Sequence, residues 1–204
     1  MSKLRKKQNN LFFYFYIFII LFFIVIFYLK YIILLTLIAG SIFIIYKIIK
    51  YNKSIKERRD LLLRTSSLNQ LLYTFHNNPY DFEKYIANYF HLSGYKNVKT
   101  TIKSNDLGKD IIMFDKNNSK IIVEVKLYSK HNLIDRPKIQ KFHSAMIDEN
   151  AKGIFVTTSD FTGPAYQFSK KHNINLMNGD TLIENIIALK AKINEIKAKK
   201  IWYN

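Results

Sequence analysis

The hydrophobic and polar positions divide the chain into an apolar N-terminal part and a part with the patterns of a folded domain. Residues 11–29 contain no charged side chain, and after Lys30 a second apolar run, residues 31–49, contains only Lys47. Each run is long enough for a membrane-spanning helix, which needs about 20 apolar residues. One continuous helix over residues 11–46 would be about 54 Å long, against a hydrocarbon core of about 30 Å. The pattern therefore predicts two spans, about 11–29 and 31–49, that meet in a tight turn near Lys30.

Basic residues flank both apolar runs and predict the topology. They gather at residues 3–7 before the first run and at residues 47–59 after the second. The positive-inside rule places both flanks in the cytoplasm, which only an even number of crossings allows. Residues 1–53 are thus predicted to be a multi-pass anchor in the cell membrane, in contact with lipid, with both termini cytoplasmic. A cleaved signal peptide is the alternative, but its apolar region should be only roughly 7–15 residues long.

Residues 54–78 are predicted to form a helical linker. Leu61, Leu68, Leu72 and Phe75 recur at close to the helical repeat, and a turn before Pro79 ends the pattern. Packing of this stripe against the following domain is the favoured interpretation. Self-association into a homodimer is the alternative, for which two heptads are weak support.

From residue 79 to residue 204 the pattern is that of a mixed α/β domain. Apolar runs that alternate or are continuous over short distances indicate strands, and amphipathic stretches indicate helices. Helices between the later strands imply parallel crossovers over a central mixed sheet. The expected strands are 96–102, 109–114, 121–127, 153–158 and 174–177, and the expected helices are 80–93, 136–149, 163–172 and a C-terminal one.

Composition narrows the classes of function. The formal net charge is +17, of which residues 1–78 supply +10 and residues 79–204 supply +7. The domain's share suits a partner that carries phosphates, although a lysine-rich solvated surface explains it equally well. Because there is no cysteine, a disulfide framework and thiolate-bound zinc are excluded. The five histidines show no HExxH spacing that would indicate a zinc enzyme.

Two carboxylates and one ammonium interrupt the apolar strands. Asp110 precedes the run Ile111-Ile112, and Glu124 and Lys126 lie in the strand 121–127. Because strand side chains alternate, Glu124 and Lys126 share one face, while Val123 and Val125 point into the core. Carboxylate oxygens suit Mg²⁺, and a nearby cation assists phosphodiester hydrolysis. An exposed edge strand decorated with charges is the plainer interpretation of these three residues alone.

Several separated motifs surround these three residues in a fixed order. They are Pro79-Tyr80-Asp81-Phe82-Glu83, Gly94-Tyr95, Ser104-Asn105-Asp106-Leu107-Gly108-Lys109-Asp110, Val123-Glu124-Val125-Lys126, Arg136-Pro137-Lys138-Ile139-Gln140, Val156-Thr157-Thr158-Ser159-Asp160-Phe161-Thr162 and Asn178-Gly179-Asp180-Thr181-Leu182. In this order, over residues 79–182, the sequence resembles the catalytic domain of Mrr-type restriction endonucleases.

The resemblance implies the PD-(D/E)xK nuclease fold, with an α/β/α core around a mixed sheet, and DNA cleavage that depends on Mg²⁺, for which Mn²⁺ would substitute. Asp110 matches the family's metal-binding aspartate, and Glu124 is the second metal ligand at a position where many members carry Gln. Lys126 matches the lysine that assists the attacking water. Glu83 matches a helical glutamate that adds an outer carboxylate, or else it is a surface acid.

Four further residues are predicted to contact DNA, each with a structural alternative. Gln140 matches a polar position of the family or lies on a helix surface, and Thr157 and Thr158 end a strand where hydroxyls reach phosphate or bond their own loop. Lys109 precedes the metal-binding aspartate. The family's loop before that aspartate usually has two glycines, whereas this chain keeps only Gly108.

These observations predict a membrane-anchored, Mg²⁺-dependent DNA endonuclease of restriction type that defends the cell against foreign or modified DNA. One alternative is a non-catalytic, membrane-tethered sensor that uses the fold to bind nucleic acid. Another is an extracytoplasmic nuclease that acts in DNA uptake or scavenging.

Overall fold

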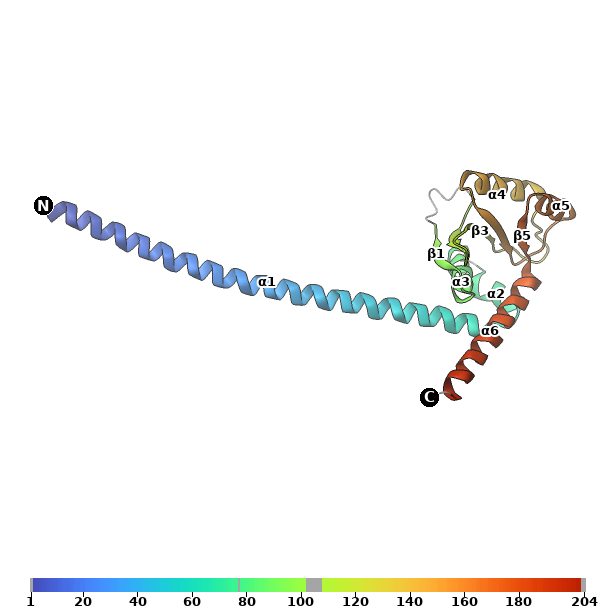
Figure 1. Cartoon of the computed structure of the whole chain (residues 1–204), viewed down its shortest axis with the longest axis horizontal. Coiled ribbons are helices and arrows are strands. Elements are labelled where there is room, and N and C mark those ends of the chain that lie inside the picture. Colours follow the sequence, from blue (N-terminus) through green and yellow to red (C-terminus); the bar gives the residue numbers. More distant parts are fainter. Residues whose placement is uncertain (1, 77, 102–107, 203–204) are drawn as a thin grey trace. The chain divides into compact units, whose positions relative to one another are not determined.

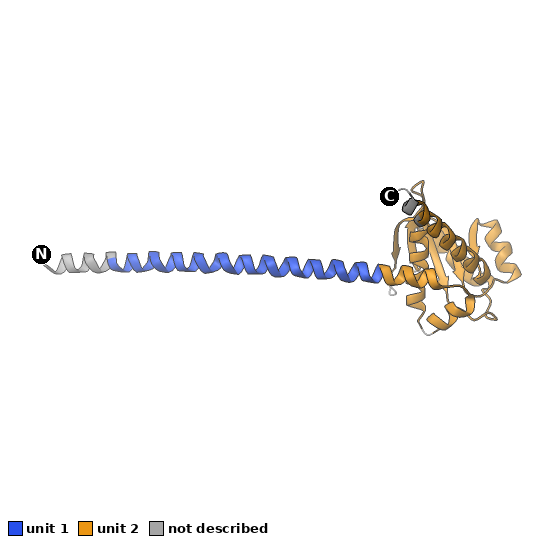
Figure 2. Ribbon diagram, turned by 90° about the horizontal axis from the view of Figure 1, so that it is seen from below, with its two compact units in different colours: residues 1–55 blue, residues 56–204 orange. Residues whose placement is uncertain are grey.

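The structure, a computed structural model, describes residues 2–76, 78–101 and 108–202. The chain divides into two compact units, residues 1–55 and residues 56–204 (Figures 1 and 2). The end of the expected strand 96–102 and the motif residues 104–107 lie outside the described residues, as does Asn77 in the expected turn. The two units are described separately below.

The first unit is a single apolar helix. Helix α1 (Ser2–Arg64) runs without interruption through Lys30, so the predicted tight turn is absent. No glycine or proline lies near Lys30, and the flanking residues Leu29 and Tyr31 sustain the backbone hydrogen-bond pattern of the helix. Among the described residues, this is the one helix long and apolar enough to cross a membrane, judged by length and composition alone; its mean hydropathy reaches 2.9 and its apolar window is exposed.

The second unit begins before the predicted linker ends. The helix expected over residues 54–75 is divided in two, because α1 ends at Arg64 and α2 (Leu68–Phe75) begins after Ser67. The Ser67 hydroxyl accepts a hydrogen bond from the Gln70 backbone N–H at 3.3 Å, and the Gln70 side chain accepts one from the Ser66 N–H at 2.9 Å. This reciprocal capping starts a new helix.

The predicted linker contributes to the core of this unit. Leu62, Leu71 and Phe75 are buried with the aromatic residues of the following helix. Of the predicted stripe, Phe75 is buried and Leu61, Leu68 and Leu72 are half-buried, whereas the buried leucines, Leu62 and Leu71, lie one position from it. This segment packs within the domain, but through a face slightly different from the one predicted.

A five-stranded mixed sheet forms the centre of the second unit. Its strands follow one another in chain order, from β1 to β5. The first three pair antiparallel, and β3, β4 and β5 pair parallel, so the predicted mixed sheet is confirmed. The strands are β1 (Lys96–Thr100), β2 (Ile111–Phe114), β3 (Lys120–Lys126), β4 (Lys152–Thr157) and β5 (Ile174–Met177).

Helices cover both faces of the sheet and give two cores (Figure 1). On one face, α2 and α3 (Pro79–Leu92) pack with α6 (Gly179–Trp202), and on the other α4 (Arg136–Asp148) packs with α5 (Gly163–Lys171). Gly153 on β4 lets α4 approach closely, because a Cβ there would lie 2.3 Å from the Met146 sulfur. The predicted α/β/α arrangement is therefore confirmed.

The alternation along β3 decides which face carries the charged residues. Val123 and Val125 belong to the core under α3 and α6, whereas Ile122 belongs to the core under α4 and α5. Glu124 and Lys126 have the same parity as Ile122, so they project on the α4 side of the sheet.

Candidate active site

Pairing between β2 and β3 brings Asp110 beside the two charged residues of β3. The Asp110 backbone N–H donates to the Val123 carbonyl at 2.8 Å, which extends the β2–β3 ladder by one residue. One carboxylate oxygen of Asp110, Oδ2, accepts a hydrogen bond from the Val125 N–H at 2.7 Å. Backbone and side chain of Asp110 are therefore both fixed against β3.

The Lys126 ammonium is surrounded by oxygen atoms. It forms an ion pair with Glu124 Oε1 and lies 3.8 Å from Asp110 Oδ2. Its third neighbour is the Val125 carbonyl oxygen, at 3.3 Å. Three of the four residues that the sequence predicted as catalytic, all but Glu83, are thus within reach of one another.

Burial and charge act in opposite directions on Lys126. Partial burial favours the neutral amine, but the charges of Glu124 and Asp110 outweigh it and raise the pKa of Lys126 above its ordinary value. Asp110 and Glu124 are themselves only 6% and 8% exposed. Lys126 is therefore an ammonium at neutral pH, and the cluster carries two negative charges against one positive charge.

These residues line a cleft of about 250 Å³ at the edge of α4. Phe142 and Phe155 also line it. Two further lysines from α4, Lys138 and Lys141, line it as well. The cleft is open enough for a phosphodiester group to approach the charged cluster.

The cluster meets the requirements of a hard divalent cation. Two carboxylates and a backbone carbonyl converge on one position that a single positive charge occupies, and all the donors are oxygen. Among the described residues, no group of three or more Asp, Glu or His side chains could hold a metal ion. Mg²⁺ needs only one or two protein carboxylates because it retains several waters. Asp110 and Glu124 therefore fit Mg²⁺ or Mn²⁺.

Two other residues predicted for the site are not part of the cleft lining. Among the described residues that line the cleft, Glu83 and Gln140 are absent: Glu83 is half-buried on α3 and Gln140 is exposed on α4. Their proposed contacts stay predictions. For Gln140 the exposure matches the alternative of a helix-surface residue.

Thr157 and Thr158 are fully buried at the end of β4. The Thr158 hydroxyl donates to the Tyr128 carbonyl at 2.7 Å and accepts from the Tyr128 N–H at 2.8 Å. The Thr157 hydroxyl accepts from the Ser159 N–H at 3.1 Å. Both hydroxyls thus bond their own chain, which is the alternative that the sequence left open.

Lys109 is also engaged within the protein. Its ammonium lies 2.5 Å from Glu149 Oε1, and its side chain is only 11% exposed. The expected contact between this ammonium and DNA is therefore not available in this conformation.

Sequence reasoning missed the two lysines of α4 as parts of the cleft. They lie three residues apart on the helix that follows the charged strand, so they share one face. This spacing, in a helix that starts beside the site, was the available signal. Lys138 is held by Asp135 at 3.1 Å, whereas Lys141 pairs with no carboxylate in the part of the chain that the structure describes.

Comparison with known proteins agrees with this fold and indicates the family. The family model Mrr_cat, a restriction endonuclease model, matches residues 76–186, which is more than half of the chain. The chain is 28% identical over 159 residues to the type IV methyl-directed restriction enzyme EcoKMrr of Escherichia coli strain K12, covering 72% of this chain and 50% of that enzyme. The chain thus spans about half the length of this relative.

One solved structure shows the same architecture, and a second is similar over a smaller part of the chain. The DNA modification-dependent restriction endonuclease AspBHI superposes with a TM-score of 0.50 at 18% identity, covering 71% of this chain and 40% of that protein. MspJI, solved in complex with a 27-mer oligonucleotide, gives a TM-score of 0.47 at 18% identity over 61% of this chain and 34% of that one. The likeness to AspBHI shows a restriction-endonuclease-like fold. Within that class, the chain belongs to the Mrr_cat family of restriction endonucleases, as the order of its motifs predicted.

Proposed function

We propose that this protein is a DNA endonuclease of restriction type that hydrolyses phosphodiester bonds with Mg²⁺, for which Mn²⁺ substitutes. The convergence of Asp110, Glu124 and Lys126 in one cleft carries the proposal. Membership of the Mrr_cat family supports it. Defence against foreign DNA is the role that follows from such an activity.

The residues of the cleft would have different roles in the reaction. Asp110 and Glu124 would hold the metal ion, which when bound polarises the phosphate and lowers the pKa of an attacking water. The Lys126 ammonium would donate hydrogen bonds to the water and to phosphate oxygens as negative charge develops. Lys138 and Lys141 would attract the DNA backbone to the mouth of the cleft.

Modified DNA is the proposed substrate class. The support is the methyl-directed activity in the name of EcoKMrr, which is 28% identical to this chain. We expect plasmid that carries methylated bases to be cut faster than the same plasmid prepared without them. Equal rates on both would assign the protein to unmodified foreign DNA instead.

The decisive experiment is cleavage of supercoiled plasmid with and without Mg²⁺. It uses the full chain in detergent and residues 56–204, since Leu62, Leu71 and Phe75 belong to the core of that unit. Asp110→Asn should abolish cutting, and Lys170→Ala, an exposed change on α5, should not. Cutting that survives Asp110→Asn contradicts the proposal. DNA binding in Ca²⁺ without cutting in Mg²⁺ or Mn²⁺ identifies the non-catalytic sensor.

We further propose that α1 anchors this nuclease in the cell membrane with the second unit in the cytoplasm. The length and hydropathy of the helix and the basic residues that follow its apolar segment support this arrangement. Because the chain has no cysteine, single cysteines report accessibility directly. A cysteine at position 204 should not react with an impermeant maleimide added outside intact cells, and it should react once the cells are permeabilised. Reaction at position 204 from outside supports the extracytoplasmic nuclease.

A further inference from the structure

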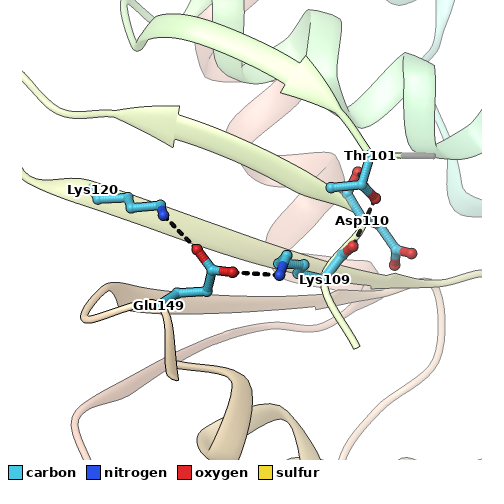
Figure 3. A network of polar contacts seen from close by, with 5 residues as sticks. All are labelled: Thr101, Lys109, Asp110, Lys120 and Glu149. Carbon is cyan, nitrogen blue, oxygen red and sulfur yellow. Dashed lines mark hydrogen bonds and ion pairs between the residues drawn. The ribbon is translucent and has the colours of Figure 1, made fainter. Parts of the chain in front are cut away.

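Glu149 joins three segments of the domain beside the site. It is the C-cap residue of α4, and each of its carboxylate oxygens takes a different lysine (Figure 3). Oε1 lies 2.5 Å from the Lys109 ammonium, and Oε2 pairs with Lys120 at the start of β3. All three side chains are partly or largely buried, with exposures of 23% for Glu149, 11% for Lys109 and 31% for Lys120. Lys109 is thus the more enclosed of the two lysines.

Lys109 immediately precedes the proposed metal ligand Asp110. Figure 3 shows the two side chains leaving the backbone in different directions, Lys109 toward Glu149 and Asp110 away from it. Thr101 holds the same peptide from the other side: its hydroxyl donates to the Lys109 carbonyl at 2.8 Å, and its N–H donates to the Asp110 carbonyl at 2.9 Å. The backbone on which Asp110 is mounted is therefore fixed at both neighbouring groups.

The ion pair constrains Lys109 more strongly than Lys120. Without Glu149, an ammonium that is only 11% exposed would lose its negative partner, and it would have to move into water. Because Lys109 and Asp110 share a peptide bond, that movement would act on the backbone next to the Asp110 carboxylate, including the Lys109 carbonyl that Thr101 holds. Lys120 lies on β3, ten residues after Asp110 in the sequence. Its side chain is 31% exposed and reaches water with little change of the backbone.

We infer that Glu149 is a positioning residue, which through its ion pair with Lys109 sets the place of the Asp110 carboxylate and thereby the affinity of the site for its divalent ion. The inference rests on the proposed metal-dependent nuclease. It assigns to the end of α4 a part in the site, although Glu149 itself touches neither metal nor DNA.

The test measures Mn²⁺ binding by electron paramagnetic resonance on the full chain in detergent, so that it does not depend on cleavage. Glu149→Gln should raise the Kd for Mn²⁺ by about tenfold or more, the usual effect of losing an outer-shell partner of a metal ligand. Asp115→Asn is the matched control. Asp115 also pairs with a lysine, Lys152, at 3.0 Å, and is 21% exposed, but it lies in the turn between β2 and β3. The Kd of the Asp115→Asn variant for Mn²⁺ should equal that of the wild type.

A pair of second-site changes separates positioning from general loss of stability. In the Glu149→Gln background, Lys109→Met removes the uncompensated buried charge and should restore most of the lost Mn²⁺ affinity. Lys120→Met, which removes the other lysine of the same carboxylate, should not restore it. Restoration by both changes or by neither overturns the inference, as does an unchanged Kd in Glu149→Gln.

The outcomes also separate this inference from the proposed function. Wild-type protein that binds Mn²⁺ with this pattern of variants but leaves plasmid intact contradicts the endonuclease and keeps the positioning role. Protein that cuts plasmid with Mg²⁺ while Glu149→Gln binds Mn²⁺ normally keeps the endonuclease and removes the positioning role.

Discussion

Two clusters of charged side chains meet at the neighbouring residues Lys109 and Asp110, and their ratios of carboxylates to ammonium groups are opposite. At the proposed active site two carboxylates, Asp110 and Glu124, share the single ammonium of Lys126. At the end of α4 a single carboxylate, Glu149, shares two ammonium groups. The first cluster has an excess of negative charge in a cleft, which a metal ion would neutralise. The carboxylate of the second cluster already pairs with two ammonium groups. This cluster therefore stabilises the structure and would not bind a metal ion. Carboxylate and lysine side chains thus bind a metal ion where carboxylates are in excess, and stabilise the fold where lysines are in excess.

Removal of the ammonium from the first cluster should have the largest effect. Lys126→Ala leaves two carboxylates without a positive neighbour, so Mn²⁺ should bind more tightly than in the wild type. Cleavage should nevertheless fall by about 10²- to 10³-fold, because a donor to the developing charge is lost. Titration with Mn²⁺ and a plasmid assay on the same preparation measure both. Weaker Mn²⁺ binding together with slower cleavage would mean that Lys126 only supports the fold.

Removal of the carboxylate from the second cluster should lower stability in a pH-dependent way. The two lysines lower the pKa of Glu149 from 4.5 to about 2. Since this pKa is lower in the folded state, the stabilisation is complete above pH 4.5 and is lost as the pH falls from 4.5 to 2. Glu149→Gln should therefore lower the free energy of unfolding by about 2 kcal/mol at pH 7. Urea denaturation of residues 56–204 at pH 7 and pH 3 measures the difference, which should shrink at the lower pH. A difference that is independent of pH would exclude the ion pairs as its cause.

A milder change makes the first cluster neutral. Glu124→Gln keeps an oxygen ligand but removes one negative charge, and it reproduces the Q-x-K form that many Mrr-type enzymes carry. We expect the Kd for Mn²⁺ to rise by about tenfold, since ligand charge tunes affinity for hard cations. Cleavage should return when the Mg²⁺ concentration is raised. Activity that no Mg²⁺ concentration restores would show that the Glu124 charge is needed in the reaction itself.

The smallest effect concerns a lysine that belongs to neither cluster. Lys141 lines the cleft without a carboxylate partner among the described residues, and its side chain lies against Gly108. Lys141→Ala should weaken DNA binding in Ca²⁺ and reduce the slope of log Kd against log salt by about one. Lys170→Ala on α5 is the control. Equal salt slopes for the two variants would place the DNA away from Lys141.

The site could be predicted from the sequence where its residues are close in the chain or are related by the two-residue alternation of side chains along a strand. Glu124 and Lys126 share a face because they are two residues apart on β3, and the β2–β3 hairpin returns Asp110 to them. The family motifs added the order of the elements. Each predicted strand and helix of residues 80–177 is present with small shifts of the ends; α3, for example, begins one residue early, at Pro79, because Asn78 caps it.

Contacts between distant segments were not predictable in the same way. Glu149 lies 40 residues from Lys109, and no periodicity relates a C-cap residue to a loop before another strand. The helix break before α2 was missed because the apolar stripe continues across it, while the capping bonds of Ser67 and Gln70 are made by side chains that interrupt no hydrophobic pattern. At Lys30 a single charge between two apolar runs predicted a turn, yet it breaks no backbone hydrogen bond of α1.

The position of helix α4 has a consequence for the order of DNA binding and cleavage. Its first turns carry Lys138 and Lys141 into the cleft, and Glu149, the cap residue at its other end, holds Lys109 next to Asp110 in the chain. One helix therefore connects the lysines that would meet the DNA backbone with the ion pair beside the proposed metal ligand. DNA that binds to the lysines would act on the metal ligand through this helix, so that DNA binding and readiness to cut would be coupled in time.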